Sequence, residues 1–186
     1  MEIDAATGWI VGIRRIESPN HDERPPGCEP GLIVVHGISL PPGEFGGTGI
    51  DELFCNALEP TKHPYYAQIC HLRVSSHALI SRTGRVTQYV SFGKRAWHAG
   101  ESSYCGRESC NDFSIGIELE GEDDVAYDDR QYDTLAAVLD ALLRAYPAIT
   151  PREIAAHSDI APGRKTDPGP AFDWLRLYDA LDTPYV

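Results

Sequence analysis

The 186-residue chain has the length of one ordinary domain and carries a formal net charge of −12 at pH 7. Proteins that bind nucleic acid or anionic membranes usually present a basic surface, so this charge argues against both kinds of partner. The composition, 42% hydrophobic and 24% charged, is that of a globular protein and excludes disordered and fibrous classes.

The N-terminal segment and the cysteines predict a cytoplasmic location. Residues 1–20 have an acidic start and only a short apolar run, unlike a secretory signal. No stretch reaches the roughly 18 uninterrupted apolar residues of a membrane span. The five cysteines form no C-x-x-C pair and are odd in number, which is typical of reduced thiols in a reducing compartment.

Hydrophobic patterns in the first half of the chain predict two regions of strand and one short helix. Residues 32–36 form a continuous apolar run, which indicates a buried strand. A loop rich in Gly and Pro over 40–49 and a short helix over 51–58 follow it. Residues 77–80 and 86–90 flank a turn that contains Gly, and they predict an antiparallel hairpin.

The second half combines a central strand with an amphipathic helix. Strict alternation over 114–120 predicts a strand with a polar face that carries Glu118 and Glu120. Asp128 and Gln131 predict the capping box of a helix that Pro147 ends.

A strand over 154–157 and a last helix over 172–181 complete the predicted elements. Strands that alternate with helices predict an α/β fold, with a mixed central sheet flanked by helices. Because no linker or repeat is visible, we expect residues 1–186 to form a single domain.

Two histidines and one aspartate form a candidate metal site. His36 and His157 each end a predicted strand, and Asp167 lies ten residues after the second. Two imidazoles and a carboxylate leave one position of a tetrahedral zinc ion open for water, whose pKa falls to about 7 there. The spacing alone does not settle the matter, because a histidine at a strand end is more often a hydrogen-bonded structural residue.

Four segments of the chain, in the same order, resemble the AmpD-type N-acetylmuramoyl-L-alanine amidases. They are residues 35–46, 96–100, 110–121 and 157–170. The resemblance extends over about residues 8–174. It implies hydrolysis of the amide bond between the lactyl group of 1,6-anhydro-N-acetylmuramic acid and L-alanine, as in peptidoglycan recycling. The implied substrate is an anhydromuropeptide, the implied cofactor is one Zn²⁺ per chain, and no obligate protein partner is evident.

Carried over position by position, the resemblance gives five residues a role. It makes His36, His157 and Asp167 the zinc ligands. Glu118 matches the carboxylate that takes a proton from water and delivers it to the leaving nitrogen. Lys165 would share with zinc the stabilisation of the developing oxyanion.

Three further residues are predicted substrate contacts. Arg73 matches a family position for the acidic end of the stem peptide, and a guanidinium suits a carboxylate. Trp97 and His98 are expected to form the wall of the cleft. The chain departs from the family at Gly37 and Ser109, where the family has Asn and Arg. These departures concern the peptide preference and leave the zinc chemistry unchanged.

Neighbouring polar residues are expected to have no catalytic role. Glu120 is interpreted as a solvated carboxylate and His77 as a hydrogen-bonded histidine of the core. Ser76 stands where phage amidases and peptidoglycan-recognition proteins of this superfamily carry a Tyr, which favours Glu118 as the proton carrier.

Two alternative functions are weighed against this prediction. The first is an amidase that acts on polymeric peptidoglycan, as an autolysin or a phage lysin does. No export or wall-binding segment is visible, which argues against it. The second is a non-catalytic protein that recognises muropeptides, and the presence of all five zinc-site residues argues against that.

Overall fold

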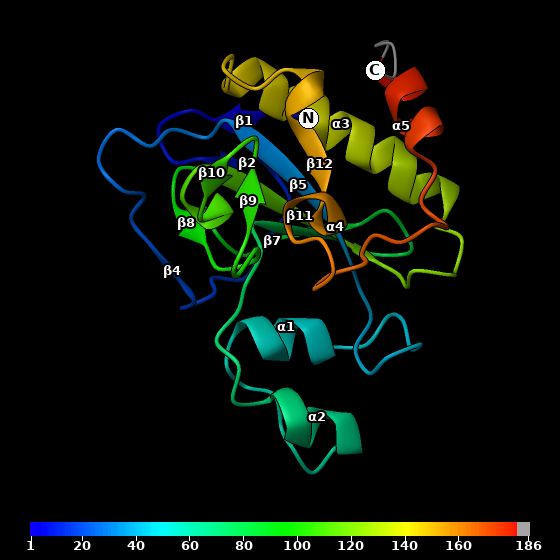
Figure 1. Cartoon of the computed structure of the whole chain (residues 1–186). Helices are drawn as coiled ribbons and strands as arrows, with labels where there is room; N and C mark the ends of the chain where they lie inside the picture. Colours follow the sequence, from blue (N-terminus) through cyan, green and yellow to red (C-terminus); the bar gives the residue numbers. More distant parts are fainter. Residues whose placement is uncertain (182–186) are drawn as a thin grey trace.

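The computed structural model describes residues 1–181, which are organised around one six-stranded sheet (Figure 1). The strand order is β12-β5-β11-β6-β7-β3. In that order the strands span Ile154–Ala156, Leu32–Ile38, Ser114–Glu120, Ala78–Ile80, Val86–Gln88 and Arg14–Arg15. Only β6 and β7 pair antiparallel, whereas the other neighbours are parallel. The predicted mixed sheet is therefore confirmed.

Helices cover both faces of this sheet. Figure 1 shows α3 and α5 on one side of it and α1 and α2 on the other. The helices span Gly49–Phe54 (α1), Pro64–Ile69 (α2), Asp129–Ala145 (α3), His157–Ile160 (α4) and Trp174–Ala180 (α5), with short 3₁₀ turns at Cys110–Asp112 and Pro151–Glu153. Within residues 1–181 no helix has the length and apolar character needed to cross a membrane.

Three two-stranded pairs complete the described part of the chain. They are β1 (Ile3–Asp4) with β2 (Trp9–Ile10), β4 (His21–Asp22) with β8 (Arg95–Ala96), and β9 (Ser103–Tyr104) with β10 (Arg107–Glu108). All three pairs are antiparallel, and none was predicted. Two-residue strands are too short to leave a period in the sequence.

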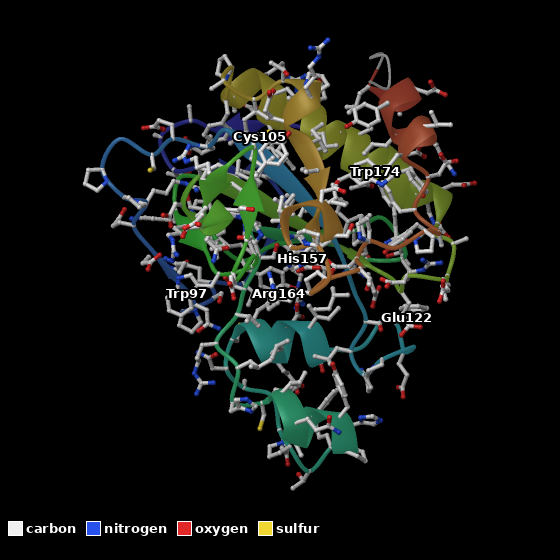
Figure 2. The ribbon with its side chains drawn as sticks, viewed as in Figure 1. Trp97, Cys105, Glu122, His157, Arg164 and Trp174 are labelled. Atoms are coloured by element: carbon white, nitrogen blue, oxygen red, sulfur yellow. The ribbon has the colours of Figure 1, made fainter. Side chains whose placement is uncertain are left out.

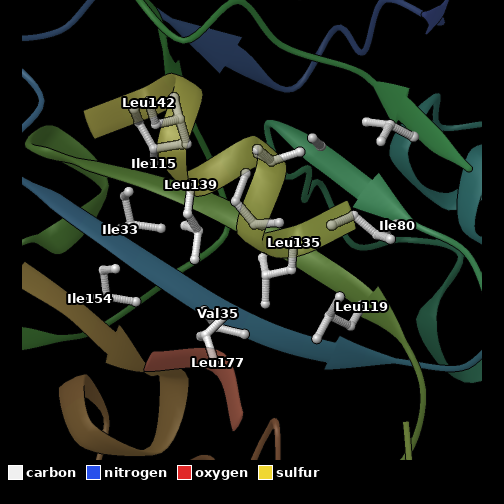
Figure 3. Close-up of a cluster of buried hydrophobic side chains, with 14 of the residues drawn as sticks. Ile33, Val35, Ile80, Ile115, Leu119, Leu135, Leu139, Leu142, Ile154 and Leu177 are labelled. Atoms are coloured by element: carbon white, nitrogen blue, oxygen red, sulfur yellow. The ribbon is translucent and has the colours of Figure 1, made fainter. Parts of the chain in front are cut away.

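The main core lies between the sheet and α3. Side chains alternate along each strand, so one face of β5 and β11 is uniformly apolar there. Figure 3 shows this face packed against α3. The core includes Ile33, Val35, Ile115, Ile117 and Leu119 from the sheet, and Leu135, Val138, Leu139 and Leu142 from the helix. The predicted capping box starts this helix, since the Asp128 carboxylate accepts the Arg130 N–H and Gln131 accepts the Asp128 N–H.

A second apolar cluster joins α1 and α2 to the opposite face of the sheet. It contains Phe54 of α1, Tyr66 of α2, Leu79 of β6 and Tyr89 just beyond β7. The sequence analysis does not predict α2. The local signal for it is the cap, where the His63 ring accepts the Tyr65 N–H at 3.1 Å before a helix that starts with proline.

The predicted strand over 154–157 is wrong at its last residue. The strand ends at Ala156, and His157 is the first residue of α4. The Asp159 carboxylate accepts the Ala156 N–H at 2.8 Å, which satisfies a free donor at the helix start. The predicted helices over 51–58 and 172–181 are confirmed in place but shorter, and β5 continues two residues beyond the predicted end. Residues 182–186 of the expected domain lie outside the described residues.

The prediction that Glu120 is solvated is also wrong. Glu120 is only 4% exposed. The carboxylate accepts the backbone N–H of Gly46 and, at 2.9 Å, that of Arg82. Glu120 therefore connects the loop over 40–49 and the β6–β7 turn to the end of the central strand.

His77 is the hydrogen-bonded core histidine that the sequence predicts. Its Nδ1 accepts the Gly116 N–H at 2.9 Å, and its Nε2 lies 3.1 Å from the Lys94 carbonyl oxygen. Burial, aided by the nearby Arg24 guanidinium, lowers the pKa of His77 to about 3. The ring therefore stays neutral in the folded protein at pH values where it is protonated in the unfolded chain.

This difference predicts a pH-dependent stability. The folded pKa of His77 lies below the unfolded value, so its contribution is complete above pH 6.5 and declines as the pH falls toward 3. Between pH 7 and pH 5 this single group should cost about 2 kcal/mol of unfolding free energy. Urea unfolding of the wild type and His77→Asn, both without metal, should show their stability difference narrowing by about this amount at pH 5. If the difference in unfolding free energy between the two proteins were the same at pH 7 and pH 5, the low pKa of His77 in the folded protein would be contradicted.

Candidate metal centre and its pocket

The parallel pairing of β5 and β11 places His36 beside Glu118. The two residues are direct partners in the register, so their side chains project from the same face of the sheet. This face is opposite the one that α3 covers, because the residues that alternate with them, Val35 and Ile117, lie in the α3 core. The site therefore starts from two adjacent strands.

His157 joins the site from the neighbouring strand. Since β12 pairs with β5 up to Ala156 opposite Val35, the next residue emerges close to His36. The Nδ1 atoms of His36 and His157 lie 2.9 Å apart, and both rings are buried. Figure 2 shows His157 in the middle of the view, with Trp97 and Glu122 on opposite sides of it.

Asp167 brings a carboxylate oxygen to the same point. Its Oδ2 lies 3.0 Å from Nδ1 of His157 and 3.3 Å from Nδ1 of His36. The Ser158 N–H donates to the Asp167 carbonyl oxygen at 3.1 Å, which fixes the loop that follows α4 against the start of the helix. The three candidate ligand atoms all lie within 4.8 Å of one another.

The electrostatics of the three groups suit a cation. Burial lowers the pKa of His36 to about 4, so this ring is neutral, as a metal ligand must be. Burial alone would raise the pKa of Asp167, but hydrogen bonds to His157 and His36 outweigh it and hold that pKa well below its usual range. Electron-rich atoms this close together require protons or a cation between them. Two imidazoles and one carboxylate fit a divalent transition metal.

His98 lies behind His36 and outside this group of ligands. Its Nδ1 is 2.9 Å from Nε2 of His36, the ring nitrogen that points away from Asp167. Its own Nε2 is 3.1 Å from the Ser114 hydroxyl. This placement puts His98 next to a candidate ligand rather than among the three candidate ligands.

Glu118 and Lys165 lie in the same pocket as the three ligands. Glu118 is 7% exposed, and no group among residues 1–181 donates a hydrogen bond to its carboxylate. Burial and the charge of Asp167 raise the pKa of Glu118 well above its usual range, and the Lys165 ammonium opposes this in part. Lys165 itself is exposed, two residues before Asp167.

The pocket has a volume of about 540 Å³ and lies between the sheet and the two helices below it in Figure 1. One wall is apolar and comes from α1, α2 and the segment that follows them. Its residues are Leu53, Phe54, Tyr65, Ile69, Leu72 and Val74. Another part of the lining is acidic and consists of Glu122, Asp123 and Asp124. The sequence analysis missed both parts of the lining, since α2 was not predicted and the acidic run follows a strand without a recognisable motif.

The three predicted substrate contacts are placed differently. His98 lines the pocket. Arg73 is exposed and donates to backbone carbonyls of its own loop, among them that of Leu72 at 3.2 Å. The Trp97 indole N–H donates to Asp22 at 3.2 Å. Neither Arg73 nor Trp97 lines the pocket, although their neighbours Leu72 and His98 do.

Tyr127 is a further residue of the site that sequence reasoning missed. Its hydroxyl donates to the Pro168 carbonyl oxygen at 2.9 Å and so contacts the loop that carries Asp167. A Cβ at Gly37 would lie 2.4 Å from this hydroxyl oxygen. The absence of a side chain at Gly37 therefore gives Tyr127 its place at the rim of the site.

Comparisons with known proteins agree with the geometry. The family model for N-acetylmuramoyl-L-alanine amidase matches residues 26–170. The 1,6-anhydro-N-acetylmuramyl-L-alanine amidase AmpD of Escherichia coli (strain K12) is 62% identical over 91% of this chain and 92% of its own length. AmpD of Haemophilus influenzae is 50% identical over 96% of this chain and 97% of its own length.

Solved structures extend the likeness to the whole fold. A crystal structure of a selenomethionine derivative of AmpD superposes with a TM-score of 0.94, at 58% identity, covering 97% of this chain and 99% of the other. An E. coli AmiD complex with its substrate superposes with a TM-score of 0.60, at 30% identity, covering 85% of this chain and 60% of the other. The chain belongs to the N-acetylmuramoyl-L-alanine amidase family and, within it, to the AmpD-type 1,6-anhydro-N-acetylmuramyl-L-alanine amidases.

Proposed function

We propose that this enzyme is a zinc amidase that cleaves the bond between the lactyl group of 1,6-anhydro-N-acetylmuramic acid and L-alanine in soluble muropeptides. The observation that carries the proposal is the convergence of His36, His157 and Asp167 on one point beside the buried carboxyl group of Glu118. Two solved relatives support the substrate class. AmiD was crystallised with anhydro-N-acetylmuramic acid-L-Ala-D-gamma-Glu-L-Lys, and AmpDh3 of Pseudomonas aeruginosa with an anhydromuramic pentapeptide.

We also propose that the enzyme works in the cytoplasm, in peptidoglycan recycling. All five cysteines are free thiols, which supports a reducing compartment. We expect each chain to form a single domain that binds one substrate molecule and needs no obligate protein partner.

His36, His157 and Asp167 would hold Zn²⁺ in this proposal. When bound, Zn²⁺ supplies a Lewis acid that polarises the amide carbonyl and makes water more acidic. The chain contributes a buried site whose ligands come from three separate segments, with both histidine rings closed off from solvent. Burial of His36 keeps its ring neutral, so its lone pair is available to a metal.

Glu118 would transfer the proton that the reaction requires. Hydrolysis of an amide takes a proton from the attacking water and gives one to the leaving nitrogen, here that of L-alanine. Burial raises the pKa of Glu118, and a raised pKa makes the carboxylate a better acceptor for the proton of water. No hydrogen bond from the described protein competes for its oxygens.

Lys165 would stabilise the charge that develops on the carbonyl oxygen. Its ammonium group lies on the pocket wall, on the same loop as Asp167. A positive group whose charge acts on His36 and Glu118 favours a negatively charged transition state over the neutral substrate.

We propose His98, Arg73 and Trp97 as residues near the substrate. His98 forms part of the pocket wall. A stem peptide that leaves the pocket beside Leu72 and Val74 would pass Arg73, which stands between these two lining residues. The substrate would reach Trp97 next to His98, because the Trp97 side chain is partly exposed.

The proposed reaction is tested by comparing two substrates with one purified sample. We expect hydrolysis of anhydromuramyl-tripeptide, little activity on intact peptidoglycan sacculi, and one zinc per chain. Strong activity on sacculi would instead assign the enzyme to wall lysis. Binding without cleavage, with zinc present, would make it a recognition protein.

Replacing the proposed proton carrier should separate catalysis from metal binding. In Glu118→Gln we expect kcat to fall by about 10²–10⁴, because an amide cannot transfer the proton. Zinc content should stay at one per chain, since Glu118 is not among the ligands. Glu120→Gln is the matched control, on the same strand and face, and should keep most of the activity. Loss of zinc in Glu118→Gln would contradict the role.

Replacing Asp167, the proposed carboxylate ligand, should weaken zinc binding itself, unlike the replacement of Glu118. Loss of a residue that only orients a ligand already weakens metal binding by 10–100-fold, so Asp167→Ala should lower zinc affinity by more than about 100-fold. Competition with a chromogenic chelator measures this without substrate. Full retention of zinc would mean that another group is the third ligand.

A further inference from the structure

His98 occupies a fixed position between the metal site and the central strand. Its ring stands at 88° to the His36 ring, with the centroids 5.0 Å apart. Gly116 leaves the necessary space, because a Cβ there would lie 2.5 Å from the His98 ring. The Asn111 side-chain oxygen accepts the backbone N–H of His98 at 3.1 Å and that of Ala99 at 2.8 Å. The His98 ring is therefore held in place by the hydrogen bonds of its backbone to Asn111 and by close packing against Gly116 and His36.

The contacts of His98 form a short chain that ends at β11. Nε2 of His36 lies 2.9 Å from Nδ1 of His98, and Nε2 of His98 lies 3.1 Å from the Ser114 hydroxyl. Both ring nitrogens of His98 are thus engaged by protein, and neither is left for a substrate. This arrangement contrasts with His77, whose ring packs against Phe92 and edge-on against His98 but whose ring nitrogens contact only backbone groups and Arg24.

The direction of the hydrogen bonds follows from the geometry of the ligands. Nδ1 of His36 points to Asp167 and His157, so a metal would take the lone pair of this nitrogen. The proton of the neutral ring must then be on Nε2, which donates to Nδ1 of His98. His98 accepts there, carries its own proton on Nε2 and donates it to the Ser114 hydroxyl oxygen.

We propose that His98 is a positioning residue that fixes the tautomer and the ring orientation of His36 for metal binding. Ser114 in turn fixes the tautomer of His98. This inference rests on the proposed metal site and extends it to two residues that do not touch the metal. It also separates the role of His98 from that of the other residues of the pocket wall, which face the substrate.

The inference is tested by zinc affinity, measured by chelator competition in the absence of substrate. His98→Phe keeps a ring but removes the acceptor for His36, and we expect zinc affinity to fall by about 10–100-fold. His98→Asn places a carbonyl oxygen near the position of Nδ1 and should recover most of the loss. Ser114→Ala should weaken binding less than His98→Phe, because it acts through one more hydrogen bond.

A second measurement reports the tautomer directly. Nitrogen-15 NMR of the zinc-bound wild type should show the His36 proton on Nε2, whereas His98→Phe should show a changed or exchange-broadened Nε2–H signal. His77→Asn is the matched control, because it alters a buried histidine that packs against the His98 ring but makes no hydrogen bond to His98 or His36. Its zinc affinity and His36 spectrum should equal those of the wild type, even if its unfolding free energy is lower.

The outcomes distinguish this inference from the proposed function. A wild type that binds no zinc would overturn the proposed metal site itself. A wild type that binds one zinc, together with His98→Phe that binds it equally well and with an unchanged His36 spectrum, would overturn the positioning role alone. Equal losses in His98→Phe and His77→Asn would also overturn it, since they would indicate general disturbance of the fold.

Discussion

The parallel pairing of β5 with β11 is the constraint on which the site depends. It places His36 and Glu118 next to each other at a distance set by backbone hydrogen bonds. Their neighbours in sequence, Val35 and Ile117, are fixed in the core against α3. A shift of either strand by one residue would turn its polar side chain into that core and move its apolar side chains to the site face. Hydrophobic packing on one face of the sheet therefore determines the chemistry on the other.

Several polar groups buried around the site have partners that offset the cost of removing them from water. His77 and Ser76 contact backbone atoms of Gly116, and Glu120 accepts two backbone N–H groups. Glu118 is the exception, with no hydrogen bond from the described residues. A buried carboxyl group left without a partner stands out where its neighbours are satisfied, and such groups are typical of functional sites.

The sequence predicted the sheet, α3 and the metal group because long periodic segments and a spaced set of chemical groups both leave a signal. It missed α2 and the two-residue strands, which are too short for a period. It also misjudged Glu120, since alternation identifies the face of a strand but not whether a loop covers that face. Tyr127 belongs to no sequence motif, although it directly precedes the capping residue of α3. Only its contact with Pro168 in the folded protein gives it a place at the site.

The ligands of the candidate site come from distant parts of the chain, since His36 and His157 are 121 positions apart in the sequence. Joining such distant points costs loop-closure entropy before any contact is gained. Metal binding would thus act as a cross-link that exists only in the folded state, and free metal would stabilise that state by mass action. During synthesis the first ligand leaves the ribosome long before the last two, so the site is completed only after most of the sheet can form. An unfinished chain that ends before His157 therefore carries only one of the three candidate ligands.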